Sequence, residues 1–364
     1  MKKHSKWLIS TLVLAVLCLL LVYTSAERDR GIRDIGMDSS SDRRSGSLSQ
    51  TTNKIESGTS HSPTNPTSTS GIGVAAGSDT IPSAQPVINC RYYVENDFMA
   101  SVSVAEKDNI GTGGSQDSLV GNKTGRIAGG IVPHHLLAGK LIASFFKTLS
   151  ETSLETLIII APNHRRYGRN SLNTSLLDWS TPFGVVKTDT ATVNKLVSRM
   201  NASLSNDLLE KEHSISSLVP YIKYYMPDVK IATFLVHGNY TAGDASKLGE
   251  MLSEELSASK NTVLIASIDF SHYLDAATAD KMDERTLKAI QAFDLRSISL
   301  MGNDNLDSPP SIITLLSAMK EIKADALEVT GHDNSAYISG KEYNYTTSYY
   351  TIFYRRPAQG RCNE

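Results

Sequence analysis

Two hydrophobic patterns alternate along the chain from about residue 88 to residue 357. The first consists of short apolar runs rich in β-branched residues, which indicate buried strands. These runs span residues 125–132, 155–161, 229–236, 261–268, 326–331 and 346–354. The second consists of longer segments with a helical period, which span residues 137–149, 244–256, 277–293 and 309–322. The alternation predicts an α/β fold: one domain, residues 88–357, with a mainly parallel central sheet flanked by helices.

Residues at the helix ends support these assignments. Asp244 opens the second helical segment and is predicted to be its acidic cap. Pro309 and Pro310 begin the last segment, where proline suits the first helical turn. Residues 212–222 repeat apolar side chains on one helical face, which predicts a further helix there.

The N-terminal region has a different pattern. Residues 1–6 contain three lysines and residues 7–23 are largely apolar, which predicts a signal peptide or an N-terminal membrane anchor within residues 1–26. The folded part is therefore expected to be secreted or membrane-anchored and extracytoplasmic. Residues 27–87 are rich in Ser, Thr, Gly and Pro and predict a disordered linker, and residues 358–364 form a short tail.

Net charge and cysteine content argue against two classes of protein, nucleic-acid binders and disulfide-rich domains. The formal net charge is −2, so no basic field favours nucleic acid as a partner. Three cysteines are too few for a disulfide framework. Cys90 and Cys362 bracket the folded part and can either pair in an oxidising compartment or remain free.

Titratable residues follow four of the predicted strands directly. His134 follows the first strand, His164 the second, His237 the third, and Asp269 with His272 the fourth. Ligands of parallel sheets gather at the carboxyl ends of the strands, and imidazoles with carboxylates are common metal ligands. Their recurrence at strand ends predicts a metal site at that edge of the sheet, although a local turn would also explain Asp269 and His272.

Simpler explanations exist for other residues near these strand ends. His237 is better explained as a surface or capping residue than as a ligand. His135 can simply begin the helical segment that follows it. Glu212 and His213 open the 212–222 pattern, so they can serve only as its cap.

Five motifs occur in an order and spacing that resemble those of the Memo family, which includes the AmmeMemoRadiSam system protein B. They are VPHHLLAG, APNH, EHSISSLVPYI, ASIDFSHY and DSPPSIITLLSA. The corresponding family motifs read approximately A-P-H-A-G, G-P-S-H-H, E-H-S-I-E-x-x-L-P and S-S-D-F-x-H. The resemblance covers about residues 128–354.

The resemblance implies a fold similar to that of the class III extradiol dioxygenases, which use non-haem iron. It also implies a metal site, since Memo-type proteins are associated with copper binding and redox activity. Carried over by motif, His134 and His164 become metal ligands. Asp269 and His272 would line the pocket, and the E-H-S-I motif would place Glu212 and His213 nearby.

One position departs from the family. Memo-type proteins supply a cysteine as third ligand before the last helix, and this chain has none there. Aligning the helix places Asp307 at the cysteine's position, while a shift of one residue would place Leu306 or Ser308 there. Two histidines and one carboxylate form the ligand set of non-haem Fe(II) oxygenases, and zinc accepts the same ligands. The cofactor is therefore expected to be a divalent or redox-active ion: Fe(II), copper or zinc.

Two main functions follow from the resemblance. The first is a metal-dependent oxidoreductase acting on a small-molecule substrate, in which His272, oriented by Asp269, is the general acid or base and His213 binds substrate or oxygen. The second is a copper- or zinc-binding, redox-handling protein without turnover. A zinc-dependent hydrolase is a third alternative. Companion proteins of the AMMECR1 type and radical SAM proteins are expected partners by the same resemblance.

Overall fold

The computed structural model describes residues 85–108, 125–166, 168, 170–341 and 345–357. The predicted signal or anchor, the linker up to residue 84, the tail and Cys362 lie outside these ranges. Among the described residues, Cys90 forms no disulfide. Within the described ranges, we find no helix that combines the length and the apolar character needed to cross a membrane.

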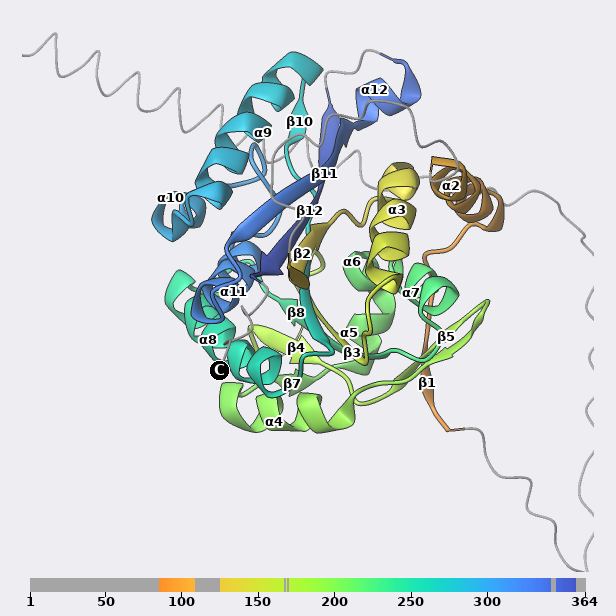
Figure 1. Ribbon diagram of the computed structural model, residues 1–364, viewed down its shortest axis with the longest axis vertical. Helices are drawn as coiled ribbons and strands as arrows, with labels where there is room; N and C mark the ends of the chain where they lie inside the picture. The colour runs from red at the N-terminus through yellow and green to blue at the C-terminus, as the bar shows by residue number, and fades with distance from the viewer. Residues whose placement is uncertain (1–84, 109–124, 167, 169, 342–344, 358–364) are drawn as a thin grey trace, which may run out of the picture. The chain divides into compact units, whose positions relative to one another are not determined.

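The core of the fold is one nine-stranded sheet, ordered β10-β12-β2-β9-β3-β8-β4-β7, with β11 paired to β12 (Figure 1). Its strands are β2 (Arg126–Val132), β3 (Thr156–Pro162), β4 (Leu172–Thr174), β7 (Ser203–Leu204), β8 (Lys230–Val236), β9 (Thr262–Ser267), β10 (His272–Leu274), β11 (Ala326–Asn334) and β12 (Thr346–Arg356). The four central strands β2, β9, β3 and β8 are parallel. β12 and β4 join this centre in antiparallel fashion. The expected α/β fold with a parallel central sheet is confirmed, with antiparallel strands added at both sides.

A small second sheet joins β1 (Val87–Asn89), β5 (Asp178–Thr181) and β6 (Gly184–Val186). β1 pairs with β5 in parallel, and β5 with β6 in antiparallel fashion. Cys90, which follows β1, continues the pairing by donating its backbone N–H to the carbonyl of Ser180 at 2.9 Å. The chain therefore enters the domain along β5 before the family motifs begin.

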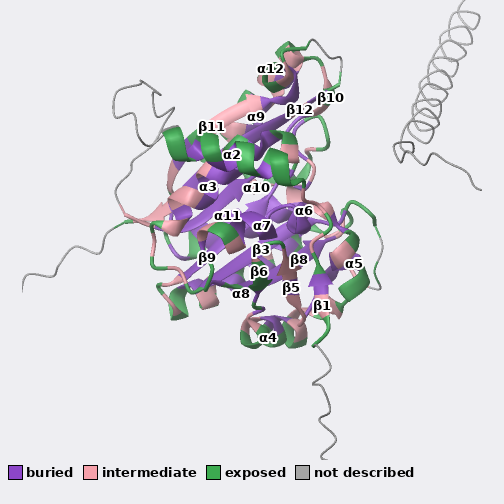
Figure 2. Cartoon of the chain, turned by 90° about the vertical axis from the view of Figure 1, so that its right-hand side faces the viewer, coloured by how far each residue is buried: buried purple, intermediate pink, exposed green. Residues whose placement is uncertain are grey.

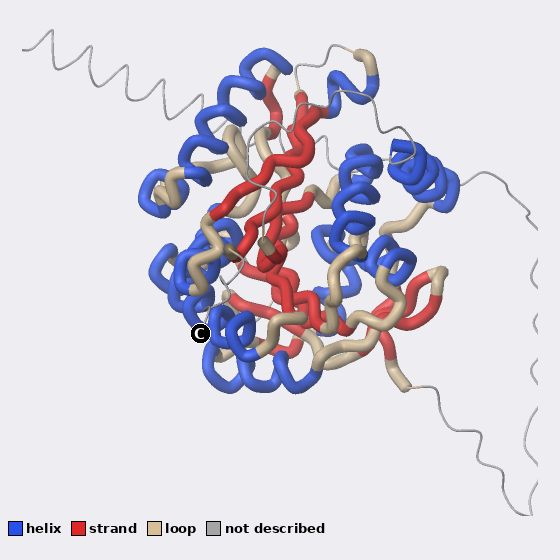
Figure 3. Tube along the Cα trace, viewed as in Figure 1, coloured by secondary structure: helices blue, strands red, loops and turns tan. Residues whose placement is uncertain are grey.

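Helices cover both faces of the large sheet, as the tube view shows (Figure 3). One face carries α2 (Glu95–Asp108), the 3-10 turn η1 (Leu136–Ala138), α3 (Gly139–Ser150), α5 (Asn206–Lys211), α6 (His213–Ser216) and α7 (Val219–Tyr225). The other carries α4 (Thr190–Met200), α8 (Ala242–Ala258), α9 (Ala276–Gln291), α10 (Leu295–Ser299) and α11 (Pro309–Glu321). The short helix α12 (Ser335–Ser339) lies between β11 and β12.

The sheet is buried on both faces because each face packs against its own helical layer (Figure 2). In β3, Ile158 and Ile160 belong to the core under α8 and α11, while Leu157 and Ile159 belong to the core under α3. All four are fully buried. This explains why β3 is a continuous apolar run without alternation.

The predicted strands and long helices are confirmed, with two local differences. α8 begins at Ala242 and its cap is Thr241, whose hydroxyl accepts from the backbone N–H of Asp244, so the assignment of Asp244 as cap was wrong. The single helix expected over residues 212–222 is divided into α6 and α7. Pro220 causes the break, since it has no N–H for the carbonyl of Ser216.

Candidate metal centre

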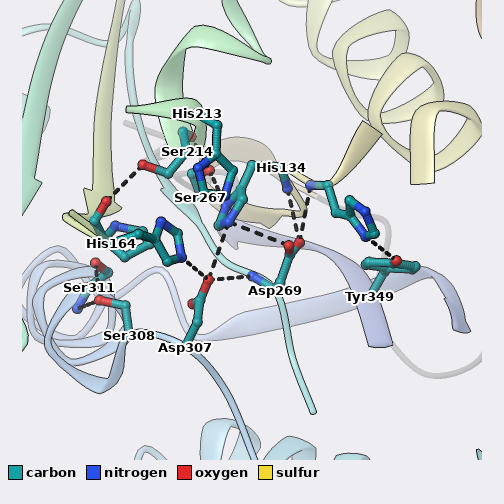
Figure 4. Close-up of polar contacts among 12 residues, drawn as sticks. His134, His164, His213, Ser214, Ser267, Asp269, Asp307, Ser308, Ser311 and Tyr349 are labelled. Atoms are coloured by element: carbon teal, nitrogen blue, oxygen red, sulfur yellow. Dashed lines mark hydrogen bonds and ion pairs between the residues drawn. The ribbon is translucent and has the colours of Figure 1, made fainter. Parts of the chain in front are cut away.

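Three neighbouring strands of the parallel centre end at the same place. β2, β9 and β3 are adjacent in the sheet, and His134, Asp269 and His164 follow their carboxyl ends. Figure 4 shows these side chains turned toward one another. The sheet topology therefore brings together residues that are up to 135 positions apart in sequence.

Asp307 approaches the same place from the start of α11. Its backbone N–H donates to the carbonyl of Asp269 at 3.1 Å. Of the two alternatives at this position, Leu306 is fully buried in the apolar core. Ser308 is the cap of α11 and accepts from the backbone N–H of Ser311. The structure thus places Asp307, and neither neighbour, beside the two histidines.

The distances around Asp307 suit a shared cation. Its Oδ2 lies 3.3 Å from Nε2 of His134 and 3.4 Å from Nε2 of His164. Asp269 Oδ2 also lies 3.4 Å from Nε2 of His134. Two ligands that are each about 2.1 Å from a tetrahedral ion lie about 3.4 Å apart. The observed spacing therefore matches that of atoms sharing one ion.

Hydrogen bonds fix the direction of each imidazole. Ser267 donates its hydroxyl to the carbonyl of Ser214 at 2.6 Å, so toward His134 Nδ1, at 3.0 Å, it must accept. His164 and His213 place Nδ1 at 2.9 Å and 3.1 Å from Oε1 of Glu212, which only accepts as a carboxylate. All three rings therefore carry a proton on Nδ1 and turn Nε2 toward the cluster. Anchoring the far nitrogen in this way is typical of metal-binding histidines.

Glu212 is the centre of this orienting network. It is fully buried at the start of α6 and caps that helix by accepting from the backbone N–H of Ser214 at 3.2 Å. Its Oε2 accepts from the backbone N–H of His164 at 2.9 Å. Burial raises the pKa of Glu212, but the bonds from His164 and His213 outweigh burial and hold it well below its usual range. The capping role expected from sequence and the role at the site belong to the same carboxylate.

The chemistry of the side chains in the cluster favours a cation. Burial holds the pKa of His134 well below its usual value, against the opposing charge of Asp307, so this ring is neutral. Burial also lowers the pKa of His164, but the hydrogen bonds that its ring donates to Asp307 and Glu212 outweigh burial and raise the pKa to about 10. Three carboxyl groups, those of Asp269, Asp307 and Glu212, lie against these two rings. Carboxylates and imidazoles together are ligands that a divalent cation accepts.

One buried atom of the cluster lacks a partner. Asp307 Oδ1 has no hydrogen bond although it is buried away from solvent. A buried carboxylate oxygen without a donor is costly, and a bound cation would satisfy it. Accessibility is uneven: His134 is 1% exposed, whereas the side chains of His164 and His213 are 31% and 38% exposed. The open side of the centre therefore lies at these two rings.

The donor atoms form two overlapping groups, each compact enough for one ion. Ring nitrogens of His134, His164 and His213 lie within 4.8 Å of one another, and so do donor atoms of His134, Asp269 and Asp307. Of the residues expected at the site, these five are brought together. His213 stacks on His164 with ring centroids 4.4 Å apart.

The expected pairing of Asp269 with His272 is not among the contacts of the described residues. Asp269 Oδ1 instead accepts from the backbone N–H of His134 at 3.1 Å and of His135 at 3.4 Å. His272 begins β10, and its backbone N–H donates to the carbonyl of Asn303. Its Nδ1 is buried without a hydrogen-bond partner. Asp269 therefore supports the His134 turn, and His272 keeps a ring nitrogen available.

Sequence reasoning missed several supporting residues. Ser267 carries a usable signal, because it is a polar residue that closes an otherwise apolar buried strand. His135 does precede the first helical turn as expected, but its Nδ1 also lies 2.6 Å from the hydroxyl of Tyr349. Burial raises the pKa of the Tyr349 hydroxyl above its usual value. No pattern in the sequence connects His135 with a residue 214 positions later.

His237 lies outside the cluster, as the simpler explanation held. Its Nδ1 accepts from the backbone N–H of Asn239 at 3.1 Å, which makes a local turn after β8.

A second group with metal-ligand chemistry consists of Asp280, Asp283 and His332. Asp283 is fully buried and accepts from Ser271 Oγ at 2.5 Å, and it lies 2.9 Å from Nε2 of His332. Asp280 accepts from Asn334 and Tyr337. Since these carboxylate oxygens all have partners, the group is explained as a structural link between α9 and β11.

Comparison with known proteins places the site in a family. The model of the Memo-like proteins matches residues 115–352. MEMO1 family proteins of Methanosarcina mazei and Methanopyrus kandleri are 28% and 29% identical over 59% and 63% of this chain, and over 81% and 84% of their own lengths. One from Pyrobaculum aerophilum is 26% identical over 73% of this chain and 96% of its own length. The match spans all the residues of the cluster.

Proposed function

Because this chain belongs to the family of Memo-like proteins, we propose that it is a metal-dependent oxidoreductase whose ion is held by His134, His164 and Asp307. The observation that carries the proposal is the convergence of two anchored imidazoles on one carboxylate. Nε2 of each ring lies within 3.4 Å of Asp307 Oδ2, and Nδ1 of each ring is held by a fixed acceptor. An ion pair with only a structural role would not require that Nδ1 of both rings be held by a fixed acceptor.

The donor set supports a harder ion than that expected for a family site with cysteine. A thiolate favours copper(I) and zinc, whereas two imidazoles and a carboxylate with open positions are typical of non-haem Fe(II) enzymes. Asp269 adds a second carboxylate 3.4 Å from His134 Nε2. We therefore favour Fe(II) as the ion, with zinc and copper as the alternatives that metal analysis distinguishes.

The surrounding residues provide positioning and proton transfer. When bound, the ion would supply Lewis acidity and, if it is iron or copper, electron transfer. His213 Nδ1 is bonded to Glu212 and its ring is partly exposed, so its Nε2 can bind substrate at the open side. His272 has an unpartnered Nδ1 that can accept or donate a proton. Asp269 holds the backbone of His134 through its Oδ1.

We further propose that the domain works outside the cytoplasm, attached through the linker to an N-terminal signal or anchor. The support is the lysine-rich start and apolar run of residues 1–26 followed by the Ser/Thr/Gly/Pro-rich residues 27–87. Fractionation of cells that express the full chain, with detection of the C-terminal domain, tests this part. Recovery in the cytoplasmic fraction would contradict it.

The central test is metal analysis of the full chain purified without metal supplementation, beside the single variants His134→Ala, His164→Ala and Asp307→Ala. We expect one ion per chain in the wild type and loss of the bound ion in each variant. His332→Ala is the matched control, since it removes a histidine from the other group, and it should retain the ion. A wild type without metal, or variants that keep it, would refute the ligand set.

Turnover is tested separately. Oxygen uptake by protein loaded anaerobically with Fe(II) is measured with a panel of small phenols and catechols, the substrate class that the dioxygenase resemblance suggests. Substrate-dependent uptake that His272→Ala reduces without loss of metal would support the enzyme. Retention of the ion with no turnover by any loaded form would instead favour the non-catalytic metal-binding alternative, and hydrolysis of simple esters by the zinc form would favour a hydrolase.

A further inference from the structure

A short segment before the family-matched region lies directly against the metal centre. Residues 90–92, here called the strap, lie in the connection from β1 to α2, and the family model begins only at residue 115. β1 packs on α5, which places the strap beside the connection from α5 to α6. Figure 2 shows α5, α6 and β1 on the same side of the molecule.

The strap binds both ends of α6. At the far end, Cys90 donates its thiol to the carbonyl of Ser216 at 3.0 Å, and the backbone N–H of Arg91 donates to Ser216 Oγ at 3.1 Å. The carbonyl of Ser216 is the one that Pro220 cannot bond within a continuous helix. The thiol therefore satisfies an acceptor that the helix break leaves free.

Tyr92 holds the near end of α6. Its hydroxyl donates to the carbonyl of Lys211 at 3.0 Å, and it accepts from Nη2 of Arg165 at 3.1 Å. Its ring contacts that of His213, with centroids 5.6 Å apart. Lys211 immediately precedes Glu212, so Tyr92 contacts the residues on both sides of the carboxylate that orients the histidines.

Helix α6 cannot hold this position by itself. It has four residues, and isolated helices shorter than about 12 residues are marginal even with favourable sequences. Its direction must come from tertiary contacts, and those at its two ends include Cys90, Arg91 and Tyr92. Displacement of α6 would move Glu212 and with it the anchor of His164 and His213.

We propose that the strap is a positioning element of the metal centre, and that Tyr92 is its principal positioning residue. Tyr92 fixes the Lys211–His213 backbone, so that Glu212 keeps Nδ1 of both His164 and His213 in place and Nε2 of each ring faces the ion. The inference rests on the proposed metal centre for its first test. It assigns a role at that centre to a residue that the family match does not include.

A residue that only stabilised the fold would behave differently, and Tyr93 provides the comparison. Tyr93 is the next residue, is partly buried, and packs its ring against Phe98 and Phe183 in the core on that face. Tyr93→Ala should therefore lower the melting temperature more than Tyr92→Ala. Tyr92→Ala should weaken metal binding more than Tyr93→Ala.

The experiment titrates the full chain and these variants with Co(II), and records the dissociation constant and the visible absorption spectrum, which reports coordination geometry. Loss of a residue that orients metal ligands typically weakens binding about 10- to 100-fold, and this is the rise expected for Tyr92→Ala, with an altered spectrum. Tyr92→Phe, which loses only the hydroxyl, should show a smaller rise. Wild-type affinity and spectrum in Tyr92→Ala, or an equal loss in Tyr93→Ala, would overturn the proposal.

A second measurement does not depend on the ion. In metal-free protein, ¹⁵N NMR of the histidine rings should report protonated Nδ1 at His213 in the wild type and in Tyr93→Ala, and a mixture of tautomers in Tyr92→Ala. An unchanged His213 signal in Tyr92→Ala would overturn the strap proposal. Failure of the wild type to bind any ion would refute the metal centre and leave this readout to decide on the strap.

Discussion

Glu212→Gln is the substitution that most directly tests how the histidines are oriented. The carboxylate is fully buried and accepts from four donors. Oε1 accepts from Nδ1 of His164, Nδ1 of His213 and the backbone N–H of Ser214, and Oε2 accepts from the backbone N–H of His164. Glutamine has the same shape, but one of its two terminal atoms is a donor. Whichever way the amide is turned, an NH₂ group faces N–H donors and at least one bond is replaced by a repulsive contact.

The magnitude follows from the number of donors left without a partner. Each buried donor that loses its acceptor costs about 1–3 kcal/mol, so the metal-free variant should lose at least this much free energy of unfolding. Loss of the charge also removes one of the interactions that raise the pKa of His164. With the ring free to turn, metal affinity should fall about 10- to 100-fold, the usual cost of removing a partner that orients a ligand.

The assay pairs urea unfolding of the metal-free protein with competition titration of the metal-loaded protein. Glu254→Gln is the matched control, because Glu254 is an exposed carboxylate whose ion pair with Arg199 lies away from the site. The control should leave metal affinity unchanged. If Glu212→Gln binds metal as tightly as the wild type, Glu212 does not orient the ligands and the proposed assembly of the centre is wrong.

Three further predictions concern the ion and the packing. The pKa of His164 is raised to about 10 in metal-free protein. The contribution of this ring to the stability of the fold is therefore fully present below pH 6.5 and is lost as the pH rises through 10. Binding of an ion near neutral pH must then release the proton of His164. Calorimetry in two buffers with different ionisation enthalpies measures this release, and identical heats would contradict it. Asp307→Cys should shift metal competition toward zinc and copper(I) and away from Fe(II), and an unchanged order would argue against Asp307 as a ligand. Gly249→Ala should lower the free energy of unfolding by about 1–3 kcal/mol in chemical denaturation, because a Cβ there would lie 2.4 Å from the carbonyl oxygen of Thr314, where α8 crosses α11. Gly243→Ala in the same helix is the control. Its Cβ would meet nothing closer than 3.8 Å, so the free energy of unfolding should not change.

The central strands and long helices could be predicted because each carries a complete local signal. β3 is a seven-residue apolar run buried on both faces, and α11 begins with two prolines and continues with an apolar face. The short strands β4 to β7 have two to four residues each, too few to show a period. β4 and β7 also depend on distant segments, since β4 pairs with β7 and β8. The sequence pattern does not show the division of residues 212–222, because the apolar face continues through residues 217 and 218, where the helix is interrupted before Pro220.

For the candidate site too, the sequence predicts the residues that carry a local signal but not the partners that lie far away in the chain. His134, His164 and Asp269 could be found because a general rule places ligands at the ends of parallel strands, and Asp307 because a family motif aligned it. The partners of these residues follow no such rule. Asp269 was assigned to His272, its neighbour in sequence, yet its carboxylate bonds the backbone of His134, which only the adjacency of β2 and β9 makes possible. Orientation of a ligand therefore depends on contacts across the sheet and from the strap, and substitutions of those partners, more than of the ligands themselves, distinguish an assembled metal centre from a chance group of polar residues.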